Sequence, residues 1–510
     1  MSILEIKDLK FSYGDKNLFN SLQMRLFPND HLGLIGANGV GKTTLMKLMA
    51  HRLDPDEGKV VWREGVTYSY LDQHLQVDSS LTIAQYLYDV YTDLFAMEEQ
   101  MNKYYDSLVD ADPSQYDKIL KSAEFLQTTL GEKGFYLIKS KIANVLNGLG
   151  ISYEVSWPMM QLSSGQRVKV FLAKMLLEEK DILLLDEPTN FLDSIHVDWL
   201  AKYLNSYKKA FVVISHNLDF IKAIANVVVE ITNKKVEIYK GDYQSYLVQK
   251  KLREDLYKTQ YEAQQKYIKK TQEFIDKNIV RASTTKRAQS RRKALEKIDV
   301  LEKPLMQKRI TFSFPFTNAY HMEALTTKKL VIGYTHPLLP ALSLKIRFGE
   351  KIAIVGKNGV GKTTFLKTIL AQIPCLAGEF WLNPLNKITY YSQEILTDKT
   401  KTAVQYIQDD YPLMDDGMIR NLLSQFGIIG ELAVKEMNKL SGGEQTKVRF
   451  AKLSLEKSNM LILDEPTNHL DRQAKDSLFK ALALYPGTVL LVTHERSFYR
   501  HLKMKEIIFG

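Results

Sequence analysis

The chain has 510 residues, a single cysteine and a net charge of +10, from 69 Lys and Arg against 59 Asp and Glu. The length predicts about two to four domains, and one cysteine excludes an intramolecular disulfide and any metal site built on several thiolates. No apolar run reaches the roughly 20 residues of a membrane span, Glu5 and Asp8 argue against a secretion signal, and the basic balance suits an anionic partner.

The chain contains a tandem repeat. Residues 36–44 recur almost unchanged as residues 356–364, at an offset of 320, whereas segments beginning at Leu162 and Leu440 match at an offset of 278. The two offsets differ by 42 residues, which locates an insertion in the first copy within about 86–136. A repeat of this size predicts two copies of one domain.

Each copy opens with a phosphate-binding pattern. Residues 36–43 and 356–363 fit G-x-x-x-x-G-K-[ST], and each follows an apolar strand-like run and precedes a helical pattern. Glycines let backbone N–H groups surround phosphate oxygens, the lysine reaches the β- and γ-phosphates, and the threonine binds Mg²⁺. The residues expected there are Gly36, Asn38, Gly39, Gly41, Lys42, Thr43, Thr44, Gly356, Asn358, Gly359, Gly361, Lys362, Thr363 and Thr364.

The insertion at about 86–136 predicts an acidic helical arm. It holds ten Asp and Glu against four Lys. Leu87, Val90, Leu94 and Met97 recur at helical spacing, and residues 112–114 form a turn signal.

Paired carboxylates follow in both copies. Asp186 and Asp464 each end an apolar run that is typical of a buried parallel strand, so they can hold a Mg²⁺ shell. Glu187 and Glu465 come next in the chain and are placed to polarise an attacking water.

A basic stretch separates the copies. Residues 250–309 carry 18 Lys and Arg against 8 Asp and Glu. The apolar spacing predicts two antiparallel helices with a coiled-coil-like seam and a turn near 278–285. The seam is expected at Leu256, Ala263, Tyr267 and Phe274 on one helix and at Ala288, Leu295 and Ile298 on the other.

The chain resembles the ATP-binding cassette (ABC) ATPases, because both copies also carry the family signature, as Leu162–Gln166 and Leu440–Glu444. The resemblance implies an α/β fold with two tandem P-loop ATPase domains at 1–246 and 310–510, joined by the helical linker at 247–309. It also implies a monomer whose two cassettes face head to tail and enclose two ATP molecules.

The resemblance assigns each ATP to residues of both cassettes. Site one pairs residues 36–44 with Ser441, Gly442, Gly443 and Glu444, and site two pairs residues 356–364 with Ser163, Ser164, Gly165 and Gln166. Serine hydroxyls and backbone N–H groups at a helix start can donate to a γ-phosphate. The family pattern further implies Gln73 and Gln393 near Mg²⁺, His216 and His494 at the γ-phosphate, Asp193 and Asp471 across the interface, and Tyr13 and Tyr334 on adenine.

Two departures from the family pattern predict unequal sites. Ser164 stands where the family usually has the first signature glycine, and Phe191 stands where the second copy has His469. Both copies keep the glutamate and the histidine, so both sites are expected to hydrolyse ATP, with site two the slower.

Within the family, the inserted arm and the basic linker resemble the ABC-F class of ribosome-binding ATPases. The alternative is the double ATPase subunit of an importer, a group that typically lacks such a linker. The zinc-containing DNA-repair and iron–sulfur ribosome-recycling classes need more cysteines than Cys375.

ABC-F membership implies a cytoplasmic protein that binds the tRNA exit site with ATP bound and leaves after hydrolysis. Its partners would be large-subunit rRNA, P-site tRNA and, at the acidic arm, a basic stalk protein. Translation rescue and antibiotic protection both stay open, and a short tip favours the former. The expected RNA contacts are Arg281, Lys286, Arg287, Arg291, Arg292 and Lys293.

Overall fold

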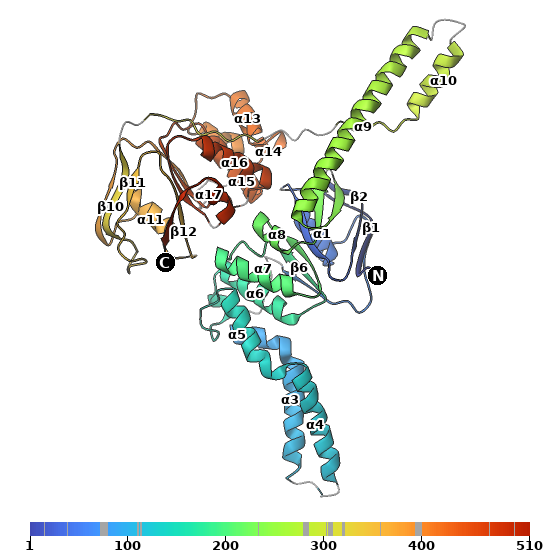
Figure 1. Cartoon of the computed structure of the whole chain (residues 1–510), viewed down its shortest axis with the longest axis vertical. Helices are drawn as coiled ribbons and strands as arrows, with labels where there is room; N and C mark the ends of the chain where they lie inside the picture. The colour runs from blue at the N-terminus through green and yellow to red at the C-terminus, as the bar shows by residue number, and fades with distance from the viewer. Residues whose placement is uncertain are drawn as a thin grey trace.

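The computed structural model places two α/β units side by side, and two helical hairpins project from the first unit in different directions (Figure 1). We call residues 1–246 the first repeat and residues 310–510 the second repeat. The structure describes residues 1–14, 16–37, 39–71, 80–109, 112, 115–232, 234–278, 285–301, 303, 310–318, 322–357, 359–392, 400–468, 470–493 and 495–509.

The main sheet of the first repeat has the order β5-β6-β7-β3-β8-β9, and all neighbours run parallel except β8 and β9. Every residue of β6 and β7 is buried, because helices cover both faces of these strands. The bounds are β3 His31–Gly36, β5 Tyr68–Leu71, β6 Ile182–Asp186, β7 Ala210–Ile214, β8 Val227–Thr232 and β9 Lys235–Lys240.

A smaller antiparallel sheet, in the order β2-β1-β4, and the surrounding helices complete this repeat. Capping side chains start the helices near the interface: Asp193 accepts from the N–H of His196, and Asn217 accepts from that of Phe220. The bounds are β1 Leu4–Tyr13, β2 Lys16–Leu26, β4 Glu57–Trp62, α1 Lys42–Met49, α2 Ile83–Tyr88, α5 Ile138–Gly148, α6 Ser164–Glu178, α7 Ser194–Ser206 and α8 Leu218–Ile224.

The second repeat has the same architecture, with a parallel sheet in the order β14-β15-β16-β12-β17 and an antiparallel sheet in the order β11-β10-β13. The predicted α/β fold of two repeated domains is therefore confirmed. The bounds are β10 Glu323–Val331, β11 Lys345–Arg347, β12 Lys351–Gly356, α11 Lys362–Ile369, β13 Ala377–Leu382, β14 Ile388–Tyr391, α12 Ala403–Gln408, α13 Asp416–Gln425, α14 Glu431–Val434, α15 Gly442–Leu453, β15 Met460–Asp464, α16 Arg472–Leu484, β16 Thr488–Val492, α17 Arg496–His501 and β17 Lys505–Phe509.

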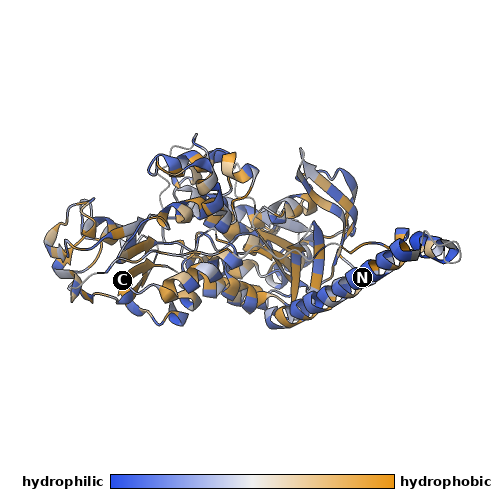
Figure 2. Ribbon diagram, turned by 90° about the horizontal axis from the view of Figure 1, so that it is seen from above, coloured by the Kyte–Doolittle hydropathy of each residue, from blue (hydrophilic) through white to orange (hydrophobic). Residues whose placement is uncertain are grey.

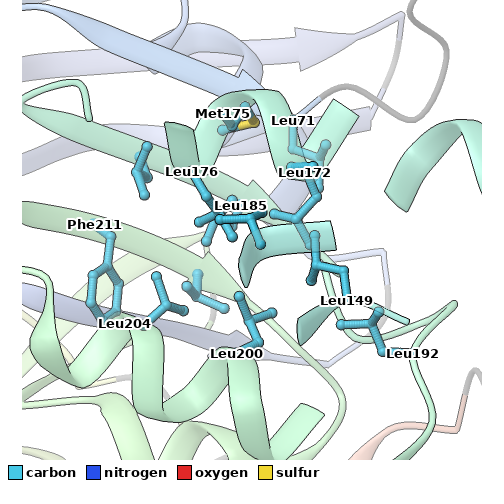
Figure 3. Packing of buried hydrophobic residues seen from close by; sticks show 14 of the residues in the cluster. Leu71, Leu149, Leu172, Met175, Leu176, Leu185, Leu192, Leu200, Leu204 and Phe211 are labelled. Carbon is cyan, nitrogen blue, oxygen red and sulfur yellow. The ribbon is translucent and has the colours of Figure 1, made fainter. Parts of the chain in front are cut away.

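The largest hydrophobic core lies between the first sheet and helices α6 and α7 (Figure 3). Leu185 of β6 and Phe211 of β7 pack in one cluster with Leu172 and Leu176 of α6 and Leu200 of α7, all of them fully or almost fully buried. This packing holds the carboxyl end of β6, where the paired carboxylates lie, at a fixed position.

The acidic arm consists of α3 Thr92–Ser107 and α4 Tyr116–Glu132, which pack along each other (Figure 1). A small core that includes Met101 and Leu130 joins them, with Leu94 and Met97 against it. Leu87 instead lies in the main core, because a 3₁₀ turn interrupts the predicted periodicity before α3. Of the predicted turn only Asp112 is described, and 113–114 lie outside the described residues.

The linker hairpin consists of α9 Tyr243–Asn278 and α10 Thr285–Glu296, and α9 is mostly hydrophilic along its length (Figure 2). The predicted seam is partly wrong. Leu256 and Tyr267 are each 54% exposed, whereas Thr271 and Ile275 of α9 are buried, as is the predicted Ala288 of α10. The reason is that α10 has only 12 residues and packs against only part of the 36-residue α9.

The turn expected near 278–285 falls mainly on residues 279–284, which lie outside the described residues. None of the helices in the described part of the chain combines the length and apolar composition of a bilayer span.

Truncating the core beside the paired carboxylates should destabilise the first repeat. Leu185→Ala removes a fully buried side chain and should lower the free energy of unfolding by about 2–5 kcal/mol. Urea unfolding followed by fluorescence measures this change. The matched control is Val109→Ala at the exposed end of the arm, which should change stability by less than about 0.5 kcal/mol; equal losses for both variants would contradict the assignment of this core.

Candidate nucleotide-binding sites between the two repeats

The same strand–turn–helix forms a phosphate-sized loop in each repeat. Gly41 and Gly361 have φ angles of 104° and 106°, a left-handed conformation that glycine adopts without strain. A Cβ on Gly41 would also lie 2.8 Å from the ring of Phe19. The backbone therefore turns from the sheet into α1 or α11, and the N-terminus of such a helix suits a phosphate.

The loop lysines lie over these turns. The Lys42 ammonium donates to the carbonyl oxygens of Gly36 and Ala37 at 2.9 and 3.0 Å, and Lys362 makes the same two contacts in its own loop. Burial lowers the pKa of both lysines, and nearby carboxylates oppose this shift. A buried ammonium group of this kind gains most from a polyanion such as a triphosphate.

The opposing carboxylates come partly from the other repeat. Burial lowers the pKa of Lys42, and Glu187 and then Asp471 partly oppose this shift. Glu465, Asp464 and then Asp193 oppose the same pKa shift at Lys362. Asp193 caps α7, which follows β6, and Asp471 caps α16, which follows β15. Each aspartate lies near the phosphate loop of the other repeat. The two repeats are thus arranged head to tail.

The strand-end carboxylates lie beside the loops. In the second repeat the Thr363 hydroxyl donates to Asp464 Oδ2 at 2.7 Å. A hydroxyl and a carboxylate oxygen at this separation suit Mg²⁺, which prefers oxygen ligands and is held partly through substrate phosphates. In the first repeat Thr43 and Asp186 line one cavity.

The two glutamates share an unusual backbone conformation. Glu187 and Glu465 have φ angles of 51° and 49°, in the left-handed region that glutamate rarely adopts. Strain of this kind is concentrated at functional sites. It turns both side chains from the strand end toward the space beyond the phosphate loop.

Glu187 contacts His216 of its own repeat, the histidine that the family pattern places at the γ-phosphate. Its Oε2 accepts from the backbone N–H of His216 at 3.1 Å, and its Oε1 lies 3.4 Å from His216 Nε2. Burial, helped by the charge of Asp186, raises the pKa of Glu187 to about 8. A buried carboxyl group with a raised pKa is suited to polarise water and accept its proton.

Site one is a cavity of about 370 Å³ with walls from both repeats. Ser441, Gly442 and Gly443 face the first repeat's phosphate loop across it. The Ser441 hydroxyl accepts from the N–H of Glu444, and the Glu444 carboxylate accepts from the N–H of Ser441, so a capping box fixes the start of α15. The residues of the first repeat are Tyr13, Leu18, Gly39, Gly41, Lys42, Thr43, Thr44, Asp186, Glu187, Ile214 and His216.

Site two is a larger cavity of about 940 Å³ in the mirrored arrangement. Ser163 and Gln166 form the equivalent capping box at the start of α6. The predicted site-two residues around this cavity are Ser163, Gly165, Gln166, Tyr334, Gly359, Gly361, Lys362, Thr363, Thr364, Asp464 and Glu465. His216 borders this cavity as well as site one.

Some predicted residues lie elsewhere. Gly36 and Gly356 end strands β3 and β12 and accept from the loop lysines. Ser164 is exposed and absent from the described cavity wall, and Glu444 caps its own helix. Asn38, Gln73, Asn358, Gln393, His494 and Arg281 lie outside the described residues.

Tyr13 and Tyr334 lie at the rims of sites one and two. These two residues are 51% and 64% exposed, which is unusual for core aromatics; their expected contact with adenine stays a prediction.

Phe191 distinguishes site two. It lines the cavity, and a Cβ built on Gly165 would lie 2.9 Å from its ring. The ring therefore packs directly against the signature segment that faces the second phosphate loop.

Three interface residues escaped the sequence analysis. Lys447 pairs with Asp471 at 2.6 Å in a buried contact, and Lys475 and Arg472 reach the first repeat. Lys169 stands at the equivalent position in the first copy, at the 278-residue offset from Lys447. A lysine repeated in both copies could have indicated that Lys447 has a role. No comparable signal marks Lys475 and Arg472, since Val197 and Ser194 occupy the equivalent positions.

The expected RNA-binding residues lie together on α10. Lys286, Arg287, Arg291, Arg292 and Lys293 are all exposed. The Arg291 guanidinium lies 3.9 Å from the centre of the Phe274 ring, which connects α10 to the end of α9.

Comparisons with known proteins cover nearly the whole chain. A profile of the family described as "ABC transporter" matches residues 19–190 and 339–468, and a second profile with the same description matches 229–314. The uncharacterized ABC transporter ATP-binding protein YfmM of Bacillus subtilis is 40% identical over 98% of this chain and 96% of its own length. Protein GCN20 of Saccharomyces cerevisiae is 33% identical over 96% and 67%, and ABC transporter F family member 2 of Arabidopsis thaliana is 31% identical over 98% and 75%.

Solved structures share the fold. RNase-L Inhibitor is similar with a TM-score of 0.56 and 19% identity over 98% of this chain and 87% of that chain. A complex of an archaeal ribosomal stalk protein with an archaeal ribosome recycling factor gives a TM-score of 0.55 at the same identity and coverage.

The two glutamates should contribute unequally to turnover. Glu187→Gln and Glu465→Gln should each reduce hydrolysis at their own site by about 100-fold or more, because glutamine cannot accept a proton. Glu187→Gln should cause the larger loss of total phosphate release, because Phe191 packs against the signature segment of site two and is expected to slow that site. Phosphate release by both single variants measures this, and Phe191→His should raise the turnover that remains in Glu187→Gln. A larger loss in Glu465→Gln would contradict the ranking.

Proposed function

Because this chain is an ATPase of the ATP-binding cassette family and belongs to its F branch, we propose that it binds the ribosome with ATP bound and leaves after hydrolysis. The basic hairpin carries this proposal. Residues 250–309 hold 18 Lys and Arg against 8 Asp and Glu, whereas the remaining 450 residues hold 51 of each. The charge excess of the chain is thus concentrated on one projecting element.

The divided sites make ATP a link between the repeats. Lys42 faces the γ-phosphate position from one side of site one, and Ser441 faces it from the other. A bound γ-phosphate accepts from both sides and holds the repeats together, and its release removes the shared acceptor. Mg²⁺ would neutralise phosphate charge when held by the oxygens of Thr43, Asp186, Thr363 and Asp464, and we include Gln73 and Gln393 from the family pattern.

The hairpin is the proposed RNA-facing element. Its five exposed basic residues on α10 present guanidinium and ammonium groups without an equal number of acidic neighbours. Such groups bind phosphates of RNA largely without sequence preference. We place the tip of the hairpin at P-site tRNA and at the rRNA of the peptidyl-transferase region.

The acidic arm is the proposed contact for a basic ribosomal stalk protein. It carries a net −6 over residues 86–136, which would repel RNA. Phe125 and Tyr136 are 71% and 63% exposed, so apolar surface is also available for a protein partner.

The short hairpin tip favours rescue of stalled ribosomes over displacement of antibiotics. Only six residues separate the end of α9 at Asn278 from the start of α10 at Thr285. We further propose a cytoplasmic monomer divided at 1–246, 247–309 and 310–510. Antibiotic susceptibility with and without the gene would separate the two roles, and cosedimentation with ribosomes rather than membranes would separate both from an importer subunit.

Blocking hydrolysis at both sites should trap the protein on ribosomes. Glu187→Gln with Glu465→Gln keeps the ATP-binding residues but removes both proton acceptors. The double variant should cosediment with ribosomes in ATP and inhibit translation and growth. Adding Lys42→Ala and Lys362→Ala should abolish the trap. Normal growth together with absence from the ribosomal fraction would overturn the ribosome assignment.

Neutralising the hairpin should weaken ribosome binding and flatten its salt dependence. Arg287→Ala, Arg291→Ala and Arg292→Ala together remove up to three phosphate contacts, so the slope of log affinity against log salt should fall by about 2–3. Binding of the trapped variant over a salt series measures this. The matched control changes three exposed lysines of the first repeat, Lys59, Lys202 and Lys208, to alanine. An equal effect of the control would contradict the hairpin as the RNA contact.

A further inference from the structure

Helix α16 of the second repeat carries a lysine that contacts the loop around His216 in the first repeat. We call this loop the switch loop. The Lys475 ammonium donates to the backbone carbonyl of His216 at 3.0 Å and pairs with Glu495 at 2.5 Å. Its side chain is only 9% exposed. Lys475 therefore connects the backbone of His216 in the first repeat to Glu495 in the second repeat. Glu495 directly follows position 494, which is equivalent to His216 at the 278-residue offset.

One turn earlier on the same helix, Arg472 reaches the base of the linker. Its Nη1 donates to the Tyr243 hydroxyl at 2.6 Å, and its guanidinium lies 5.6 Å from the centre of the Tyr243 ring. Tyr243 is the first residue of α9 and is almost fully buried. The second repeat thus holds the start of the helix that carries the basic hairpin.

Tyr243 also contacts the element that follows His216. Asn217 caps α8 directly after His216, and Lys222 in the last turn of α8 lies 5.9 Å from the centre of the Tyr243 ring. Tyr246 packs against Tyr243 with ring centres 5.3 Å apart, and Lys250 pairs with Glu230 of β8 at 2.5 Å. The start of α9 is therefore firmly packed between α8, the first sheet and Arg472.

On the pseudo-equivalent side of the interface, the sequence has no cation at the positions of Arg472 and Lys475. At the 278-residue offset, Ser194 and Val197 replace Arg472 and Lys475. A nearby ion pair across the interface, Arg496 with Asp198, spans 3.7 Å between side chains that are both more than half exposed. Such a pair contributes little, because water screens it.

We propose that Arg472 and Lys475 are positioning residues that couple site one more strongly than site two to the linker hairpin. Lys475 also lines the site-two cavity, but the residue whose backbone it holds, His216, contacts Glu187 of site one. Lys475 holds the backbone of the site-one switch loop, and Arg472 holds the base of α9 from the same helix. Closure of site one on ATP then moves α16, and α16 changes the angle of the hairpin through Tyr243. The proposal deepens the proposed function, because the hairpin is its RNA-facing element, but the test uses the free protein with ATP alone.

Paired spin labels can measure the hairpin angle. Cys375→Ser removes the single native thiol, and Glu273→Cys on α9 with Lys208→Cys on the first repeat supplies two exposed label positions. When ATP is present, Glu187→Gln blocks hydrolysis at site one, so ATP stays bound there. Glu465→Gln does the same at site two. The label distance should shift on adding ATP in the first background and shift less in the second.

Removing one hydroxyl should break the coupling. Tyr243→Phe loses only the acceptor for Arg472, and Arg472→Ala loses the donor, so both should abolish the ATP-dependent shift in the Glu187→Gln background. Tyr246→Phe is the matched control, because this equally buried tyrosine of the same cluster should keep the shift. An unchanged shift in Tyr243→Phe and Arg472→Ala, or equal shifts in both glutamine backgrounds, would overturn the proposal. Loss of ribosome binding with the coupling intact would instead count against the proposed function alone.

Lys475 has a separate test in the Glu465→Gln background, where phosphate release reports site one. Lys475→Met should lower kcat by about 10-fold with little change in KM, because a displaced switch loop affects the reacting geometry more than ATP binding. Lys475→Arg keeps the charge and the donors and should restore most of the rate. Turnover of Lys475→Met within twofold of its parent, or no rescue by a normally folded Lys475→Arg, would refute the positioning role.

Discussion

Neither repeat holds a complete site for the phosphates, and this division of each site is the constraint on which the rest of the structure depends. Lys42 approaches site one from the first repeat and Ser441 from the second, and Lys362 and Ser163 do the same at site two. A triphosphate is a dense polyanion whose oxygens need donors on several sides. The residues suited to bind the phosphates therefore lie on both sides of the interface at each site.

The groups around this interface are ionisable and buried, which makes it sensitive to small changes in charge. The pair between Lys447 and Asp471 spans 2.6 Å and is almost inaccessible to water. Glu187 lies beside Asp186 in a site where burial raises its pKa to about 8. Buried charges are stable only when paired, so removing either partner of the Lys447–Asp471 pair would leave an uncompensated charge at the interface.

The projecting elements separate the charge of the molecule. The basic hairpin α9–α10 and the acidic arm α3–α4 leave the first repeat in different directions (Figure 1). Both are attached to this repeat through packed cores, the hairpin by Tyr239, Tyr243 and Tyr246 and the arm by continuity with α5. A rotation of the second repeat can therefore act on the hairpin through one helix end, where Arg472 meets α9.

The sequence alone was sufficient to predict the α/β fold, the repeat and the two insertions, because these depend on contiguous patterns. The phosphate loops, the Asp186–Glu187 pair and the capping boxes at Ser163 and Ser441 are each complete within a few residues. Two offsets, 320 and 278, located the arm without structural knowledge. The predicted seam of the hairpin was partly wrong, because apolar spacing along α9 cannot show how far its partner helix extends.

The family pattern already paired each phosphate loop with the opposite signature segment, but tertiary structure alone decided the other contacts across the interface. Ser164 was expected in the wall of site two but is exposed and absent from it, while Phe191 packs onto the signature segment. Arg472 and Tyr243 lie 229 residues apart, and neither stands in a motif that the repeat or a period would reveal. Such contacts depend on how two folded units dock, and docking is set by the whole shape and charge of two surfaces, which no local pattern encodes.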